Sequence, residues 1–323
     1  MRIVFMGTPD FAVPCLEALV AAGHEIAGVV TQPDRPKGRG HKLTPPPVKV
    51  LAEAKGLPVN QPERIKHPDF VGTLKELAPE MIVVVAFGQL LSKEILTLPK
   101  YGCVNVHASL LPGYRGAAPI HWAVINGETE TGVTIMYMDE GLDTGDMILR
   151  ESIPIEAGDT TGTVHDKLSA MGARLVEAVA QISAGTARRV PQDHAKSTYA
   201  PILTKEVELI HWEKNAAEVR NLIRGLNPWP GAFTYYGGQV LKIWSAEEWE
   251  EGTVSVAAGR VAASNQPENR PGQVTAVLPK SGFVVLTGHG RLLVTEIQLQ
   301  GSRRMPAADF VHGHGVTPGI VLG

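Results

Sequence analysis

Two polar side chains at the end of an apolar segment are the residues of this sequence best placed to do chemistry. Cys103 to His107 alternates like a buried strand, so Asn105 and His107 point to one face and the two valines to the other. In open α/β sheets ligands bind at the carboxyl ends of strands, where an amide and an imidazole can donate to an oxygen that gains negative charge. The alternative interpretation is a structural Asn–His pair that fixes a loop, because buried polar groups need partners.

The segments that follow this pair favour a site. Residues 109–116 (Ser-Leu-Leu-Pro-Gly-Tyr-Arg-Gly) form a long irregular loop, and loops at strand ends commonly carry function. A second predicted strand, 131–139, is followed by Glu-Gly-Leu-Asp-Thr-Gly-Asp, whose glycines permit close approach of a ligand. A carboxylate there can pair with the imidazole and fix its tautomer. Asp139, Asp143 and Asp146 all fit this role on spacing alone.

No residue of this region is placed to form an acyl-enzyme. Ser109 follows the histidine closely, but the sequence has no G-x-S-x-G motif. His312 and His314 lie in a glycine-rich tail, which we expect to be mobile rather than a pair of metal ligands. The residues therefore favour direct transfer, in which a positioned amine attacks a carbonyl group whose oxygen is stabilised by Asn105 and His107.

The first half of the chain alternates strand-like with helix-like segments. Expected strands are 2–6, 25–31, 81–87, 103–107 and 132–139, and expected helices are 11–22, 47–55, 68–77, 119–125 and 160–184. This alternation predicts an α/β fold with a doubly wound parallel sheet and right-handed crossovers. The Asn–His pair would lie at the carboxyl edge of that sheet.

The pattern changes after residue 185. Turn-forming residues predict a linker over 190–206, between a catalytic domain at 1–189 and a smaller domain at 207–323. Short strands are expected at 233–236, 240–244, 272–278, 282–287 and 292–299, and five such strands are typical of a small barrel. Residues 254–271 are rich in small and polar types, and we expect an exposed loop there.

Composition bounds the class of protein. A chain of 323 residues suits two domains, and its net charge of −3 argues neither for nor against a nucleic-acid partner. The longest apolar run, 81–87, is far shorter than the roughly 20 residues of a membrane-spanning helix. The N-terminus has no signal-peptide pattern, and there are only two cysteines, Cys15 and Cys103, so a cytoplasmic location is expected.

The candidate site resembles a known family signature. Residues 105–119 (Asn-Val-His-Ala-Ser-Leu-Leu-Pro-Gly-Tyr-Arg-Gly-Ala-Ala-Pro) and 141–145 (Gly-Leu-Asp-Thr-Gly) resemble the 10-formyltetrahydrofolate-dependent formyltransferases. Their signature is an Asn, a His two residues later, a Ser-Leu-Leu-Pro loop and an Asp after the next strand. The resemblance selects Asp143 over the other two aspartates. It covers nearly the whole chain and is weakest over 247–271 and the last residues.

Within that family the chain is most similar to the members that formylate initiator methionyl-tRNA in translation initiation. The features that carry this are 7–11 (Gly-Thr-Pro-Asp-Phe), the basic loop that begins at Thr31, and 227–231 (Asn-Pro-Trp-Pro-Gly). The resemblance implies a Rossmann-like formyltransferase domain and a C-terminal OB-like barrel that binds tRNA. It implies transfer of a formyl group from 10-formyltetrahydrofolate to the free amino group of the methionyl moiety, by a monomer without a metal.

The resemblance also implies roles for individual residues. Asn105, His107 and Asp143 would be catalytic. The residues expected to contact the folate are Phe87, Gly88, Gln89, Leu90, Ser109, Leu110, Leu111, Pro112, Asp139 and Gly141. The residues expected to contact the tRNA are Arg35, Lys37, Arg39, Lys42, Arg303 and Arg304.

The charge of the segment 31–49 agrees with an RNA partner. Five Lys or Arg residues stand against one Asp, a net charge of +4 over 19 residues, and glycines at 38 and 40 predict a flexible loop. Such a loop beside a catalytic edge can bind the phosphates of an acceptor stem. Taken alone, a run of this kind is more often an ordinary solvated surface. Residues 207–323 carry ten basic and ten acidic residues, so an RNA-binding face there requires local clustering.

Other proteins of the same fold are alternatives. One is a formyltransferase that acts on glycinamide ribonucleotide or an amino sugar, although the purine enzyme would lack the barrel. A formyltetrahydrofolate hydrolase would need no basic loop. A non-catalytic RNA-binding protein with a vestigial site is an alternative of a different class, and the complete Asn–His–Asp set argues against it.

Overall fold

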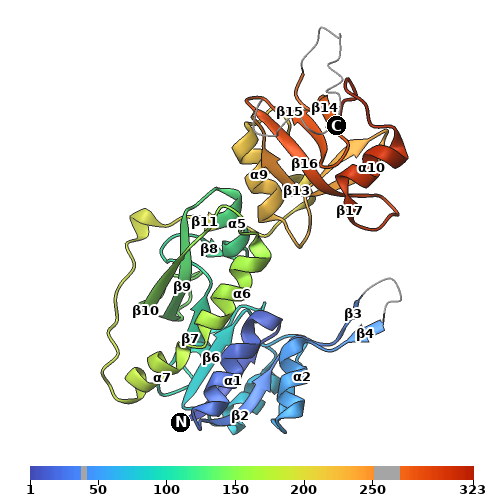
Figure 1. The fold of residues 1–323 in the computed structure, drawn as a ribbon. Coiled ribbons are helices and arrows are strands. Elements are labelled where there is room, and N and C mark those ends of the chain that lie inside the picture. The colour runs from blue at the N-terminus through green and yellow to red at the C-terminus, as the bar shows by residue number, and fades with distance from the viewer. Residues whose placement is uncertain (38–41, 251–269) are drawn as a thin grey trace. The chain divides into compact units, whose positions relative to one another are not determined.

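The computed structural model (Figure 1) describes residues 1–37, 42–250 and 270–323. The chain divides into two compact units. The first comprises Met1–Pro119, Glu130–Pro154 and Val164–Pro201, and the second comprises Ile120–Thr129, Ile155–Thr163 and Ile202–Gly323. Strand β11 (Tyr199–Ala200), which lies in the predicted linker, pairs with β8 (Arg115–Gly116) within the first unit. The limits 1–189, 190–206 and 207–323 stay a prediction.

A seven-stranded sheet forms the centre of the first unit, in the order β10-β9-β7-β6-β1-β2-β5. Its strands are β1 (Arg2–Gly7), β2 (Glu25–Val30), β5 (Val59–Asn60), β6 (Met81–Val85), β7 (Cys103–His107), β9 (Glu130–Tyr137) and β10 (Met147–Pro154). The expected parallel pairing is confirmed from β5 to β7. Strand β9 differs, because it runs antiparallel to both β7 and β10. The loop 138–146 that joins β9 to β10 is too short for a parallel crossover, which accounts for the antiparallel pairing of these two strands.

Helices cover both faces of this sheet, as predicted for a doubly wound fold. The helices of the first unit are η1 (Asp10–Ala12), α1 (Val13–Ala21), α2 (Pro47–Ala54), α3 (Pro68–Glu76), α4 (Lys93–Leu96), most of α6 (Thr161–Gly172) and α7 (Leu175–Ser183). Helix α5 (Pro119–Ile125) belongs to the second unit from Ile120 onward. On one face, Gly172 approaches Cys15 and Val106 so closely that a Cβ would lie 3.0 Å from the sulfur. On the other face, Val84 packs in one cluster with Leu74 of α3 and Ile95 of α4.

The predicted long helix 160–184 is wrong, because the structure has two helices there. Helix α6 ends at Gly172, and the next two N–H groups bond three residues back, from Ala173 to Ala170 and from Arg174 to Met171. Such tighter bonding is common where helices end, and glycine weakens a helix interior. The amphipathic pattern continues through both helices, so periodicity alone cannot show the break.

The second unit is built on an antiparallel sheet, as predicted. Its strands are β12 (Phe233–Tyr236), β13 (Gln239–Glu248), β14 (Val274–Leu278), β15 (Gly282–Leu286), β16 (Arg291–Leu299) and β17 (Met305–Pro306). The end of the chain joins the two outer strands, since Ile320 accepts from Val274 at 2.7 Å and Gly323 donates to Tyr235 at 3.1 Å. The expected loop 254–271 lies, up to residue 269, outside the described residues.

Helices complete the core of this second unit. They are α9 (Ala216–Gly225) and α10 (Ala307–His314), and the short helix α8 (Lys205–Glu208) precedes them in the chain. The expectation of a mobile tail at 312–314 is wrong, because these residues belong to α10. The ring of His314 stacks on Phe310 at 4.3 Å, and a ring nitrogen of His312 lies 3.2 Å from the Pro279 oxygen. Phe310 is fully buried, and this anchors the helix.

None of the helices in the described ranges is long and apolar enough to cross a lipid bilayer.

Both cysteine thiols should be unreactive in the folded protein. Burial raises the pKa of Cys15 and of Cys103 to about 12, and only the thiolate is a nucleophile. We expect no reaction of the native chain with a disulfide reagent at mildly alkaline pH, and reaction of both thiols after denaturation. Rapid labelling of either thiol in the native protein would contradict the packing of both faces of the sheet.

Candidate functional site

The predicted polar pair lies at the end of β7. Asn105 is half-buried, and its amide has no hydrogen-bond partner among the residues that the structure describes. His107 is buried, with Nε2 2.9 Å from the backbone oxygen of Tyr114, to which it can donate. Its Nδ1 lies 3.7 Å from Oδ2 of Asp143. The structure thus brings His107 and Asp143 together and leaves the amide of Asn105 open to a ligand.

The loop after β9 must turn back to reach this pair. Tyr137, the last residue of β9, lies beside Val104 near the start of β7, whereas His107 lies beside Thr134. Asp143 therefore approaches His107 only because the 139–146 loop folds back. Asp143 has a φ of 52°, a left-handed conformation that Asp tolerates better than most residues.

Hydrogen bonds hold the folded loop in place. The N–H of Gly116 donates to Oδ2 of Asp143 at 2.8 Å, which ties the carboxylate to the loop after β7. Asp139, a rival candidate from spacing, instead accepts from the Gly141 N–H at 3.0 Å and from Oγ1 of Thr144 at 2.5 Å. The carboxylate of Asp139 is thus bonded to residues of its own loop. Of these two aspartates, only Asp143 faces the imidazole of His107.

The Ser-Leu-Leu-Pro segment is locked by its own contacts. Ser109 is buried and its hydroxyl donates to the Gly113 oxygen at 2.7 Å. Thr134 of β9 donates to the Ser109 oxygen at 2.7 Å and accepts from the Leu111 N–H at 3.1 Å. Ser109 and Leu111 thus shape the loop, whereas Leu110 and Pro112 are only half-buried. The Ser109 hydroxyl is not free to act as a nucleophile.

The other predicted folate segment follows β6. Phe87 is buried, and its oxygen accepts from Oγ1 of Thr8 at 3.1 Å. The side chain of Gln89 accepts from the Ile65 N–H at 2.9 Å and so braces the neighbouring 62–65 segment. Gly88 and Leu90 are exposed, Leu90 to 68%. Leu142, on the loop after β9, is also an exposed apolar side chain, at 45%.

The predicted tRNA contacts fall in two places. Arg35 is exposed and lies 3.7 Å from Glu63. The backbones of Lys37 and Lys42 pair in the hairpin of β3 (Arg35–Lys37) and β4 (Lys42–Thr44), and Arg39 lies outside the described residues.

The two predicted arginines of the second unit differ in their surroundings. Arg303 is exposed. Arg304 donates to both carboxylate oxygens of Glu296 at 2.6 and 2.5 Å, and its guanidinium lies over the ring of Trp244. The charge of Arg304 is therefore already paired.

Comparison with known proteins places the chain in a family. A family profile described as "Formyl transferase" matches residues 1–179, and one described as "Formyl transferase, C-terminal domain" matches residues 202–315. The chain belongs to the formyl transferase family.

Whole-length relatives agree with this membership. Proteins named methionyl-tRNA formyltransferase from Pelotomaculum thermopropionicum and Desulforamulus reducens are 57% and 53% identical over 324 residues, with 100% of this chain and 99% and 98% of theirs covered. A crystal structure of WlaRD, titled a sugar 3N-formyl transferase in the presence of dTDP and 5-N-formyl-THF, has the same fold. It aligns with a TM-score of 0.63 at 18% identity, covering 94% of this chain and 99% of that one.

Three residues that shape this formyl transferase site were not found from the sequence. Gln192 lies in the predicted linker, yet it is buried and donates to the backbone of the Asp143 loop. Arg115 is buried and donates to Gln192. Thr134 locks the loop after β7. A lone glutamine, arginine or threonine gives no sequence signal of such contacts, because they depend on segments that are far apart in the chain.

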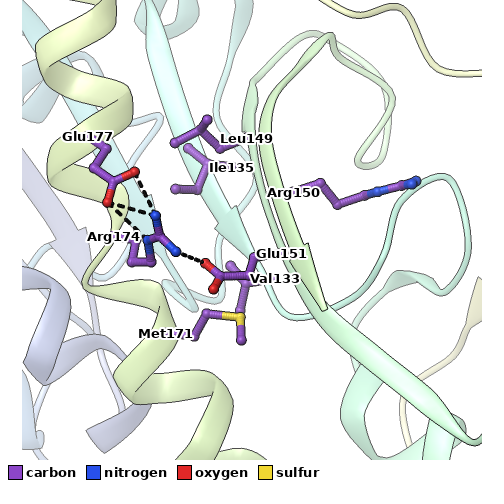
Figure 2. Close-up of a pocket in the computed structure, with 8 residues that line it drawn as sticks. All are labelled: Val133, Ile135, Leu149, Arg150, Glu151, Met171, Arg174 and Glu177. Atoms are coloured by element: carbon purple, nitrogen blue, oxygen red, sulfur yellow. Dashed lines mark hydrogen bonds and ion pairs between the residues drawn. The ribbon is translucent and has the colours of Figure 1, made fainter. Parts of the chain in front are cut away.

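A separate pocket of about 300 Å³ lies on the other face of the sheet (Figure 2). Val133 and Ile135 line it, and they flank Thr134, so they point away from the face that carries His107. Arg174 lies between Glu151 and Glu177, with ion pairs of 2.7 and 2.9 Å. The guanidinium is thus paired with both carboxylates, and the pocket is not part of the candidate site.

Within the described ranges, no group of three or more His, Cys, Asp or Glu side chains is arranged to hold a metal ion.

A methyl group at position 145 should displace the loop that carries Asp143. A Cβ on Gly145 would lie 2.0 Å from the backbone oxygen of Tyr137, so the loop must shift. We expect Gly145→Ala to lower kcat for formyl transfer by roughly 100-fold, the cost of misplacing a catalytic group by about 1 Å.

The matched control is Gly158→Ala, because a Cβ there meets nothing within 4 Å. This control should keep a kcat close to that of the wild type. Equal rates for Gly145→Ala and the wild type would show that the position of the 139–146 loop does not matter for the reaction.

Proposed function

We propose that this chain transfers the formyl group of 10-formyltetrahydrofolate to the free amino group of the methionyl moiety of initiator methionyl-tRNA. The observation that carries the chemistry is the open amide of Asn105 beside the His107–Asp143 pair, 3.7 Å apart. The choice of acceptor is supported by the whole-length relatives that carry this activity in their names. A monomer acting in the cytoplasm is part of the same proposal.

The residues around the site suit a folate. Two exposed apolar side chains, Leu90 and Leu142, lie on the two loops that we assign to the co-substrate. Gly88 is exposed and has a φ of 85°, so its backbone groups are accessible. A flat pterin can pack against such leucines while its polar edge bonds to backbone groups. Of the residues expected to bind the folate, Ser109, Leu111, Phe87, Gln89 and Asp139 act by shaping these loops.

The proposed chemistry is a direct attack by the amine on the formyl carbon. As the C–N bond forms, negative charge grows on the formyl oxygen, and the amide of Asn105 donates a hydrogen bond to it. We assign His107 as the second donor. Its Nε2 must then exchange the Tyr114 oxygen, 2.9 Å away, for the formyl oxygen, while its Nδ1 stays beside the Asp143 carboxylate. As the bond between the formyl carbon and the folate nitrogen breaks, that nitrogen takes up the proton that the attacking amine loses. The separation of 3.7 Å between Asp143 and His107 leaves the carboxylate able to relay this proton through a water.

Removal of the Asn105 donor should slow the chemical step. We expect Asn105→Ala to lower kcat by roughly 100- to 1000-fold at saturating folate, with little change in KM for the folate. Asn105→Asp keeps the size of the side chain but not the donor, so it should lose activity similarly. Near-normal turnover of either variant would refute the role of Asn105.

A substitution in the basic loop should weaken the use of the tRNA and leave the binding of the folate unchanged. Arg35 is 66% exposed and its pairing with Glu63 is long, at 3.7 Å, so its charge can serve a phosphate. We expect Arg35→Ala to lower kcat/KM for charged tRNA by roughly five- to tenfold. The slope of the logarithm of the tRNA affinity against the logarithm of the salt concentration should fall by about one, as expected for the loss of one phosphate contact. The KM for the folate should not change.

Arg188→Ala is the control for that measurement, because Arg188 is also exposed but lies outside the basic segment. It should behave like the wild type in both assays. If Arg35→Ala instead raised the KM for the folate, the basic loop would belong to the folate site, and the proposed division of roles would fail.

The proposed function as a whole is tested by the choice of acceptor. The protein is incubated with 10-formyltetrahydrofolate and either charged initiator methionyl-tRNA, free methionine, an amino sugar nucleotide or glycinamide ribonucleotide. We expect formylated methionyl-tRNA and no comparable product from the others. Formylation of a small amine in preference to the charged tRNA would identify a different member of the family, and formylation of none would refute the enzyme assignment.

A further inference from the structure

A buried glutamine lies behind the loop that carries Asp143. Gln192 is 6% exposed. Its Nε2 donates to the backbone oxygens of Asp143, at 2.9 Å, and Gly145, at 2.8 Å. Its Oε1 accepts from Nε and Nη2 of Arg115, at 3.1 and 2.6 Å. The two ends of the amide therefore join two separate loops of the site.

The partners of this amide fix its orientation. The guanidinium of Arg115 can only donate, so it must meet Oε1. The two backbone oxygens can only accept, so they must meet Nε2. Arg115 is itself held, because it is buried and its Nη2 lies 3.2 Å from Nδ1 of His194. If the amide were rotated by 180°, its oxygen would face the two backbone oxygens and its NH₂ group would face the N–H groups of Arg115. Neither pair could form a hydrogen bond.

These contacts close a ring around Asp143. The N–H of Gly116 donates to the Asp143 carboxylate. The preceding residue, Arg115, donates to the side chain of Gln192, and Gln192 donates to the backbone oxygen of Asp143. Asp143 has a φ of 52°, and such a conformation in a residue other than glycine persists only when its surroundings impose it. Gln192 supplies that constraint on the backbone, whereas Gly116 supplies it on the side chain.

We propose that Gln192 is a positioning residue for formyl transfer, which holds the backbone of Asp143 so that its carboxylate faces His107. The inference rests on the proposed function. Glutamine is required chemically: a glutamate would keep the volume and the contact with Arg115. It would, however, place a carboxylate oxygen against the two backbone oxygens and push the loop away from the site.

The test is a double-mutant cycle between Gln192 and Asp143. The single-turnover rate of formylation of charged initiator methionyl-tRNA is measured with excess enzyme and saturating 10-formyltetrahydrofolate for the wild type, Gln192→Glu, Asp143→Asn and the double variant. We expect Gln192→Glu to lower the rate roughly 10- to 100-fold in the wild type but less than about threefold when Asp143 is already Asn. A merely structural role would lower both rates by the same factor.

Gln273→Glu is the matched control. Gln273 is 4% exposed, belongs to the second unit and accepts from the Arg270 N–H at 3.2 Å. Like Gln192→Glu, it places a carboxylate at a buried glutamine, so its Tm should fall, but its formylation rate should stay near that of the wild type.

Two results would overturn the inference: a wild-type rate for Gln192→Glu, or the same loss of rate with and without the Asp143 carboxylate. If Gln192→Glu does not fold, Gln192→Ala, which leaves room for a water at the two backbone oxygens, is measured in the same two backgrounds and decides by the same criterion. Failure of the wild type to formylate the tRNA would instead refute the proposed function, so the two failures are distinguishable.

Discussion

The hydrogen bond between the Gly116 N–H and the Asp143 carboxylate is the contact on which the candidate site depends. It joins the loop after β7 to the loop after β9, although β9 ends beside the start of β7. Because β9 runs antiparallel, the carboxylate can reach His107 only if its loop folds back over the sheet. The glycines at 141 and 145, the internal bonds of Asp139 and the left-handed backbone of Asp143 all serve that fold.

Much of the architecture can be predicted from the sequence because the signals are local. The apolar segment 81–87 predicts a buried strand, and β6 occupies 81–85 of it. The five short strands predicted after residue 232 all occur, although β13 continues to Glu248, four residues beyond its predicted end. The same-face placement of Asn105 and His107 follows from strand alternation alone. Helices α6 and α7 have the same amphipathic pattern, so the sequence does not show the break between them.

The remaining features depend on contacts between distant segments. Asp139, Asp143 and Asp146 are equivalent on spacing, and the family resemblance was needed to choose among them, because the antiparallel direction of β9 is not visible in its residues. Gln192 lies 49 residues from Asp143 in sequence and has no motif around it. Its burial and its four hydrogen bonds are properties of the folded chain, so no periodicity predicts them.

The chemistry proposed for this site places no covalent step on the protein. The hydroxyl of Ser109 is bonded within its loop, and both thiols are buried with a pKa of about 12, so none of these groups is a ready nucleophile. The site instead offers the open amide of Asn105 as a donor, beside an imidazole that is held between the Tyr114 oxygen and the Asp143 carboxylate. Such an arrangement lowers a barrier by stabilising charge, and it requires the amine and the formyl group to be present together.

The most direct measurement is the intact mass of the protein during the reaction. The protein is mixed with 10-formyltetrahydrofolate, quenched before and after addition of charged methionyl-tRNA, and weighed by mass spectrometry while formylated tRNA is counted. Direct transfer predicts an unmodified protein at every time point, together with full formation of the formylated tRNA. A protein heavier by one formyl group, which then passes that group to the tRNA, would contradict the account.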